Sequence, residues 1–182
     1  MQPSHRFLLA AVLLTASAFS ALPASAGEYA HSIEVKKMTF DWKVDGDRLR
    51  VRLKAPTTGW VAIGFNPLKG MMGADLILGY VEDGKVTVSD EFGNQENAHE
   101  PDTKQGGTND LTDISGTEAN DATEIRFTRL LKPADPKDGE IKTDKFITIA
   151  LAYSAKRDSL NTKHLQRAKV QVNLGTGEMK PL

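Results

Sequence analysis

Short runs in which apolar and polar residues alternate constrain the fold of this chain most. Residues 48–53 read Arg-Leu-Arg-Val-Arg-Leu, which puts the apolar side chains on one face of a strand and the arginines on the other. Residues 85–90 and 123–129 alternate in the same way. Asp-Gly pairs at 45–46 and 83–84 are typical of tight hairpin turns. This period of two predicts half-buried β-strands joined by short connections.

Other segments are more continuously apolar or mixed, and they predict the remaining strands. These segments are 33–43, 60–65, 75–81, 146–153 and 168–174. The whole chain thus provides about eight strands, and no long segment has the period of a helix. We expect an all-β fold, an antiparallel β-sandwich or barrel of about eight or more strands. The polar stretch at 91–122 is expected to be a long connection.

The first 26 residues have the features of a secretory signal. A His-Arg pair at 5–6 precedes an apolar run at 7–19, and Ala-Ser-Ala at 24–26 matches a cleavage site. The apolar run is shorter than a membrane-spanning helix requires. We therefore predict a signal peptide over 1–26, one mature domain over 27–182 without a membrane span, and a periplasmic or secreted location.

Composition excludes several classes of function. The 182 residues include no cysteine, so disulfides, thiolate nucleophiles, iron–sulfur clusters and covalently attached c-type haem are impossible. The 23 basic and 24 acidic residues give a formal charge of −1, and no basic stripe indicates nucleic-acid binding. No Ser-His-Asp set or carboxylate pair has a catalytic spacing, so we do not expect an enzyme.

Three long connections hold the residues of greatest chemical interest. If successive strands simply alternate in direction, the connections at 66–74, 91–122 and 154–167 lie at the same end of the sandwich. Long connections gathered at one end are typical of a binding site. The first contains Gly-Met-Met-Gly at 70–73, and the last contains His164.

A thioether and an imidazole form a common pair of axial ligands for haem iron. Other roles remain open for these residues, because adjacent methionines also fill cores and a histidine in a charged loop is often simply exposed. Gly-Gly-Thr-Asn-Asp at 106–110 has groups that bind an anion or Ca²⁺, but it lacks the spacing of an EF-hand. His31 and His99 lie in no recognisable pattern.

At these residues the chain resembles the DOMON family. The similarity rests on Gly-Trp-x-x-x-Gly-Phe at 59–65, Gly-Met-x-Gly-Ala-Asp at 70–75, Gly-Tyr-Val at 79–81 and a histidine, His164, before the last strand. It continues through residues 106–131 and covers most of the mature chain. The resemblance implies an immunoglobulin-like β-sandwich.

The haem-binding branch of that family includes cytochrome domains of flavocytochrome dehydrogenases and haem subunits of bacterial molybdenum dehydrogenases. Its members hold a non-covalent haem b between a methionine and a histidine or lysine. Carried onto this chain, the resemblance implies Met71 and His164 as the iron ligands. Met72 is the alternative to Met71, and Lys163 is the alternative to His164.

Residues around these ligands are expected to shape the haem site. Gly70 and Gly73 let the backbone approach a large flat ligand closely, and Trp60 offers an aromatic wall. Two protein ligands leave the iron no open position, so the resemblance implies electron transfer to a redox protein or a membrane electron-transfer complex. Because other family members bind sugars, a carbohydrate- or small-ligand-binding module without a redox role is the alternative. A non-catalytic assembly subunit is a third possibility.

Overall fold

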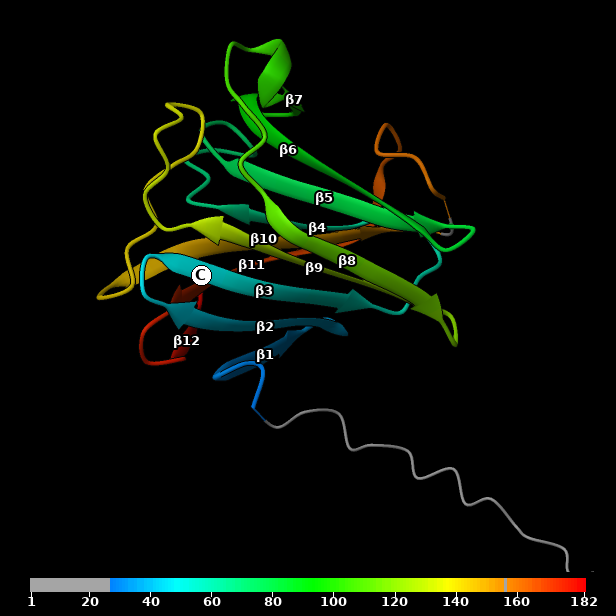
Figure 1. Cartoon of the computed structure of the whole chain (residues 1–182), viewed down its shortest axis with the longest axis horizontal. Helices are drawn as coiled ribbons and strands as arrows, with labels where there is room; N and C mark the ends of the chain where they lie inside the picture. The colour runs from blue at the N-terminus through cyan, green and yellow to red at the C-terminus, as the bar shows by residue number, and fades with distance from the viewer. Residues whose placement is uncertain (1–26, 156) are drawn as a thin grey trace, which may run out of the picture.

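Two antiparallel β-sheets packed face to face make up this protein. The structure is a computed structural model that describes residues 27–155 and 157–182. The signal peptide predicted over 1–26 lies outside the described residues and stays a prediction. The sheets have the orders β1-β2-β3-β9-β8 and β12-β11-β10-β4-β5-β6-β7 (Figure 1). The described strands are β1 (His31–Val35), β2 (Met38–Asp45), β3 (Arg48–Ala55), β4 (Val61–Phe65), β5 (Asp75–Glu82), β6 (Lys85–Gln95), β7 (Ala98–Pro101), β8 (Thr112–Ala119), β9 (Ala122–Leu130), β10 (Phe146–Ser154), β11 (His164–Asn173) and β12 (Met179–Pro181).

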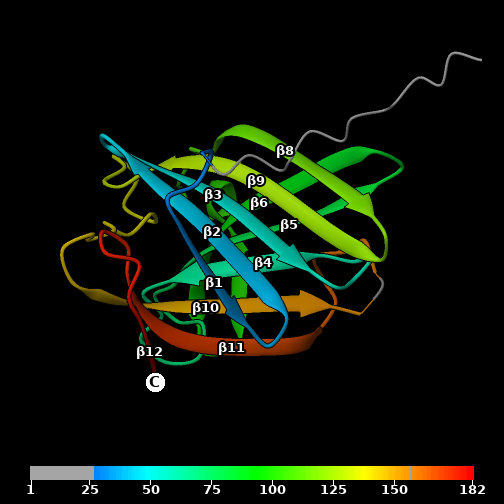
Figure 2. The same ribbon diagram turned by 90° about the horizontal axis from the view of Figure 1, so that it is seen from below.

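The core lies between the sheets and follows the alternation of the sequence. On β3, residues 49, 51 and 53 are buried while the arginines between them point outward, as the period of two predicts. Bulky side chains from both sheets fill the interior, among them Phe40, Trp42, Ile63, Phe65, Ile77, Phe127 and Ile149. The predicted all-β sandwich is confirmed, and Figure 2 shows its two layers from below.

β4 and β5 of the seven-stranded sheet are buried on both of their faces. Ile63 and Ile77 point into the sandwich, while Leu76 and Leu78 point away from it and are nevertheless only 7% and 3% exposed. Connections between strands cover this outer face, which is why these segments are almost continuously apolar in the sequence.

The polar stretch at 91–122 is largely structured, which corrects the expectation of one long connection. It contains the end of β6, all of β7, a short 3₁₀ helix η1 (Asp102–Lys104) and β8. β8 is an edge strand with polar residues and exposed side chains on both faces, so its sequence does not alternate.

The expected common end of the three connections is also wrong, because strand directions do not alternate in the way the sequence count assumed. β4 and β10 run antiparallel, with Phe65 opposite Ile149 and Val61 opposite Tyr153. The connection at 66–74 therefore leaves one end of the sheet, and the connection at 155–163 leaves the other (Figure 1). The sequence count omits the strands β7 and β8, and strand direction does not alternate strictly through the segment that contains them.

Candidate functional site

The outer face of the seven-stranded sheet brings the two predicted ligand loops together despite their opposite origins. A second apolar cluster lies there, away from the main core, and we call it the outer-face cluster. It consists of Trp60, Ala62, Ala74, Leu76 and Leu78. Met71, from the connection at 66–74, and Leu160, from the connection at 155–163, both pack against it. The two loops thus fold over one surface from opposite ends.

Backbone hydrogen bonds fix the loop that carries Met71. The Met71 amide donates to the Glu96 carbonyl at 2.9 Å, and the Gly73 amide donates to the Gly93 carbonyl at 2.7 Å. Gly70 has φ +60°, and a Cβ there would collide with the Glu96 carbonyl oxygen. Only glycine suits this position, because the backbone is left-handed and the neighbouring strand is too close. The loop is therefore docked firmly on the β6–β7 hairpin.

The two adjacent methionines have different surroundings. Met71 is partly buried against the outer-face cluster, whereas Met72 is 37% exposed. Met71 is therefore the methionine directed at the candidate site. Across the same face, the Lys169 ammonium on β11 donates to the Gly70 carbonyl at 2.7 Å and holds this loop from the other side.

Trp60 positions the opposite loop. Its indole is 4% exposed, and Nε1 donates to Thr162 Oγ1 at 3.0 Å. Its amide donates to Ser154 Oγ at 2.9 Å. Trp60 therefore serves as a buried support for the chain that leads to His164, and also as a member of the cluster.

His164 begins β11 and is paired with Ser154 beyond a β-bulge. Ser154 lies two residues after Ala152 on β10, and Ala152 packs against the outer-face cluster. The bulge interrupts the alternation of side chains at the Ser154–His164 pair. The side chains of both His164 and Lys163 are exposed. Met71 and His164 come from connections at opposite ends of the sheet, and it is Leu160, four residues before His164, that packs with Met71 on the outer-face cluster.

Small side chains leave a shallow depression in the middle of this face. Ala62, Gly64, Ala150 and Ala152 lie on the outward side of the neighbouring strands β4 and β10. Leu76 from β5 covers Gly64, where an added Cβ would meet the leucine Cδ2 at 2.6 Å. The result is an apolar floor bordered by Met71 at one end and by the Trp60 loop at the other, which is a surface suited to a flat apolar ligand.

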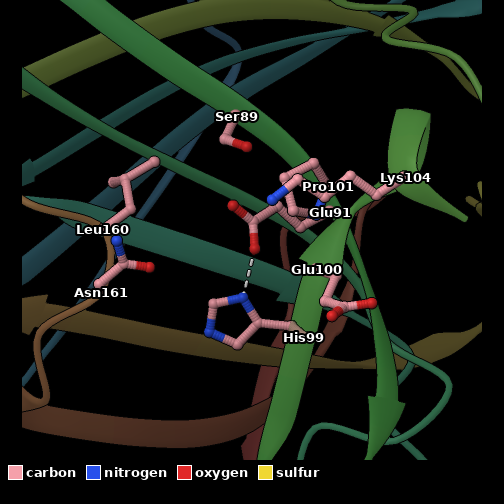
Figure 3. Close-up of a pocket in the computed structure, with 8 residues that line it drawn as sticks. All are labelled: Ser89, Glu91, His99, Glu100, Pro101, Lys104, Leu160 and Asn161. Atoms are coloured by element: carbon pink, nitrogen blue, oxygen red, sulfur yellow. Dashed lines mark hydrogen bonds and ion pairs between the residues drawn. The ribbon is translucent and has the colours of Figure 1, made fainter.

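A pocket of about 440 Å³ opens beside this floor. Leu160 and Asn161 form one wall, and residues of β6, β7 and η1 form the other (Figure 3). His99 Nδ1 is hydrogen-bonded to the Glu91 carboxylate within it. Burial is the largest single influence and raises the pKa of Glu91, but the hydrogen bonds from His99 and Ser89 and the nearby positive charges together lower it below its usual value.

His99 and Glu91 are site residues that the sequence did not reveal. A histidine whose Nδ1 contacts a carboxylate has a fixed ring orientation and is well prepared to bind a metal through Nε2. The His99 Nε2 atom has no hydrogen-bond partner within the described part of the chain. No motif marks the pair, because their contact depends on the β6–β7 hairpin, which was itself not predicted.

Comparison with known proteins gives matches in sequence. Residues 34–154 match the model of the DOMON domain. The chain is 31% identical over 140 residues to DBH-like monooxygenase protein 1 of Mus musculus, and 32% identical over 117 residues to that of Homo sapiens. These matches cover 72% and 64% of this chain but 22% and 18% of the relatives. The chain thus spans about a fifth of the length of these curated relatives.

Solved structures with a similar fold are cytochrome domains. The cytochrome b domain of pyranose dehydrogenase from Coprinopsis cinerea has a TM-score of 0.60 at 14% identity, covering 77% of this chain and 78% of that one. The cytochrome domain of Myriococcum thermophilum cellobiose dehydrogenase has a TM-score of 0.57 at 14% identity, covering 80% and 82%. At this identity the likeness is one of fold.

Proposed function

Because the chain belongs to the DOMON domain family, we propose that it is an exported b-type haem-binding module that transfers electrons and is not itself a catalyst. The observation that carries the proposal is the packing of Met71 and Leu160, from loops at opposite ends of the sheet, on one apolar cluster. The sandwich that presents this face has the fold of cytochrome domains. In the described part of the chain, no helix is long and apolar enough to cross a membrane.

The residues on this face suit haem b. Met71 and His164 are the proposed axial ligands, and both bind iron without adding a charge. The amides of Met71 and Gly73 hold the Met71 loop against the β6–β7 hairpin, Gly70 allows the close approach, and Trp60 holds the opposite loop through Thr162. Ala62 and Ala152 provide an apolar floor. When bound, haem b supplies a one-electron redox centre.

The exposed position of His164 suits contact with a redox partner. His164, Lys163 and Leu165 are all exposed, and Leu165 is 63% accessible to solvent. Electron-transfer contacts are small and partly electrostatic, so a short exposed segment of this kind is sufficient. The proposed partner is another redox protein or a membrane electron-transfer complex.

An absorbance scan of the purified protein, oxidised and then reduced with dithionite, tests the proposal. We expect the spectrum of a six-coordinate b-type cytochrome. Met71→Ala should change it strongly, and the matched control Met72→Ala should not, because Met72 points to solvent. A colourless protein that cannot be reconstituted with haem would overturn the proposal.

A second set of variants identifies the nitrogen ligand. His164→Ala should abolish the six-coordinate spectrum, whereas Lys163→Ala and His99→Ala should leave it intact. His99 is included because its ring faces the pocket beside the floor (Figure 3). If only His99→Ala alters the spectrum, haem binding stands and the assignment of His164 is wrong.

A carbohydrate- or small-ligand-binding role is the second candidate, and the pocket in Figure 3 favours it. Ser89, Glu91, Lys104 and Asn161 line that pocket with groups that hydrogen-bond to hydroxyls. No Trp, Tyr or Phe is among its lining residues to stack on a sugar ring. Calorimetry with a panel of sugars tests this role, with Glu91→Gln as the variant expected to lose the signal.

A further inference from the structure

Five aspartates are buried together at the end of the sandwich from which the Met71 loop leaves. They come from four separate parts of the chain: β5, β6, η1 and the connection at 131–145. They are Asp75, Asp90, Asp102, Asp135 and Asp138, each between 1% and 8% exposed. Carboxylate oxygens of Asp75, Asp90 and Asp138 lie within 4.8 Å of one another, and so do those of Asp102, Asp135 and Asp138. Asp138 joins the two groups.

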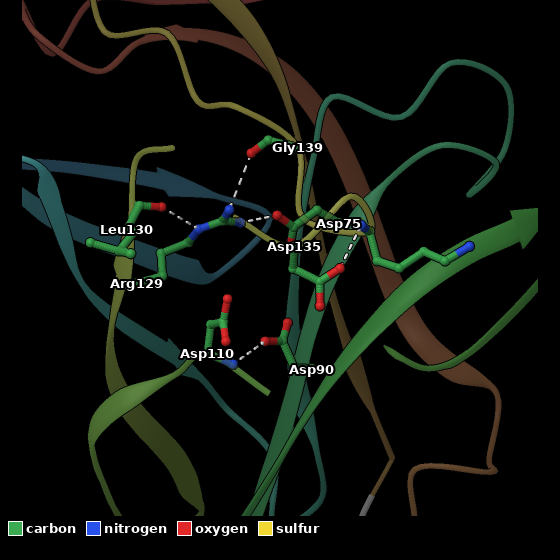
Figure 4. Close-up of polar contacts among 8 residues, drawn as sticks. Asp75, Asp90, Asp110, Arg129, Leu130, Asp135 and Gly139 are labelled. Atoms are coloured by element: carbon green, nitrogen blue, oxygen red, sulfur yellow. Dashed lines mark hydrogen bonds and ion pairs between the residues drawn. The ribbon is translucent and has the colours of Figure 1, made fainter. Parts of the chain in front are cut away.

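Arg129 compensates only part of this charge. The Arg129 side chain is 3% exposed. Its guanidinium forms an ion pair with Asp75 Oδ2 and donates to the Gly139 carbonyl at 3.2 Å (Figure 4). Among the described residues, no other side chain forms an ion pair with any of the five aspartates. If all five were ionised, four of them would have no ion-pair partner among the described residues in a water-poor interior, which is strongly unfavourable.

Several oxygens of the cluster have no partner. Asp75 Oδ1, Asp90 Oδ1 and both oxygens of Asp102 are buried without a hydrogen bond to any described residue. Asp102 is 1% exposed, so solvent does not reach it freely. Asp135, in contrast, accepts hydrogen bonds from the Lys137 amide at 2.8 Å and from Thr108 Oγ1 at 3.0 Å. Buried polar atoms in folded proteins are normally satisfied, so the first set requires a further partner.

We propose that Asp102, Asp135 and Asp138, which lie beside Asp75 and Asp90, bind a divalent cation of the Ca²⁺ class. The ligands are all carboxylate oxygens, which hard cations prefer, and no histidine or cysteine belongs to the groups. Ca²⁺ binds oxygens at about 2.3–2.6 Å, so two ligands on opposite sides of it are about 4.6–5.2 Å apart. Oxygens within 4.8 Å of one another therefore suit one ion.

The cation would add a link between η1 and the connection at 131–145, next to the start of β5. Asp75 starts β5 directly after the Met71 loop, Asp102 lies in η1 and Asp138 lies in the connection at 131–145. The aspartates lie at the end of the sandwich, whereas the candidate haem face is the outer side of the sheet. The cation site is therefore independent of haem, and loss of one does not imply loss of the other.

Shared protons are the competing way to satisfy the cluster. Burial and neighbouring carboxylates raise the pKa of Asp90 to about 8 and that of Asp138 to about 7. Neutral carboxyls would then donate to one another. Calcium and protons compete for the same oxygens. An experiment at a pH where the cluster can either keep its protons or exchange them for Ca²⁺ therefore distinguishes the protonated cluster from the calcium-bound one.

Calorimetry on the EDTA-treated, dialysed full-length protein at pH 7.5 is the test. CaCl₂ is titrated to several millimolar, so that even a site with a dissociation constant on the order of 10⁻³ M is detected. We expect one ion per chain, a higher melting temperature with Ca²⁺ than with EDTA, and weaker binding of Mg²⁺. If CaCl₂ produces no heat and does not change the melting temperature, the proposal is overturned in favour of shared protons.

Two variants and one control locate the site. Asp102→Asn and Asp138→Asn should weaken Ca²⁺ binding at least about tenfold. Their metal-free forms should melt no lower than metal-free wild type, because an uncharged amide removes repulsion. Asp121→Asn, on an exposed turn, should bind Ca²⁺ as wild type does. Unchanged binding in both cluster variants would place the ion elsewhere and refute the assignment.

Discussion

Lys169 Nζ on β11 lies 2.7 Å from the carbonyl oxygen of Gly70, so this strand reaches across the outer face to the loop that carries Met71. Lys169→Met keeps the apolar stem and removes the donor. We expect a loss of about 0.5–1 kcal/mol in unfolding free energy, because the bond is exposed. Hydrogen exchange of the loop amides at 68–73 should accelerate. Lys85→Met, at the exposed start of β6, is the matched control, and equal exchange in both variants would contradict the prediction.

Trp60 and Thr162 provide a second measurable link. Trp60→Phe keeps an aromatic ring but loses Nε1, and Thr162→Val loses the acceptor. Thr162 Oγ1 also donates to the Ser159 carbonyl at 2.9 Å, so the valine variant alone removes two bonds. A double-mutant cycle by urea unfolding should give a coupling energy of about 1 kcal/mol. Strict additivity would mean that the indole does not hold this loop.

Two glycines separate steric from conformational effects. Gly70 and Gly46 both have left-handed backbones, with φ +60° and +62°. An added Cβ meets the Glu96 carbonyl at Gly70 but nothing within 4 Å at Gly46. We expect Gly46→Ala to cost about 1 kcal/mol, and Gly70→Ala to cost clearly more, about 2–4 kcal/mol. Chemical denaturation measures both, and equal losses would show that the Met71 loop adapts easily.

The aspartate cluster predicts an unusual pH dependence for protein kept in EDTA. The pKa values of Asp90, Asp138 and Asp102 are raised, chiefly by burial, to about 8, 7 and 6, so the folded state binds protons that the unfolded state has released. Their contribution to stability is complete below pH 4 and is lost as the pH rises through these values. The melting temperature should therefore fall between pH 5 and pH 9.

Addition of Ca²⁺ at pH 8 should reverse that fall, because the cation replaces the missing protons. Asp138→Asn in EDTA should show a shallower decline than wild type. A melting temperature that rises from pH 5 to pH 9 in EDTA would contradict the predicted protonation of the cluster.

Some strands of the fold could be predicted from the sequence, whereas others could not. β3 and β5 were predictable because one alternates and the other is covered on both sides, and each condition leaves a clear pattern. β8 was missed because both of its faces are polar. Because β7 and β8 were both absent from the predicted strands, the assignment of loops to ends was wrong.

The aspartate cluster shows where a sequence pattern fails altogether. Asp75 and Asp138 are 63 positions apart and meet only because β5 and the connection after β9 reach the same end of the sandwich. The motif at 106–110 has groups that bind an anion or Ca²⁺, but the Asp110 amide donates to Asp90 at 3.3 Å and its carboxylate is not among the grouped ones. Proximity of this kind follows from topology, which local spacing does not encode.

β8 has a further consequence for the behaviour of the protein in concentrated solution. It is an unpaired sheet edge, where another polypeptide would otherwise add a strand. A bulge between Thr112 and Ser115, with Asp113 at φ +53°, interrupts the row of backbone donors and acceptors. Acidic and hydroxyl side chains on both faces of β8 make it unfavourable for another sheet to pack against this strand. The polarity that hides this strand from pattern analysis thus also guards the sandwich against aggregation.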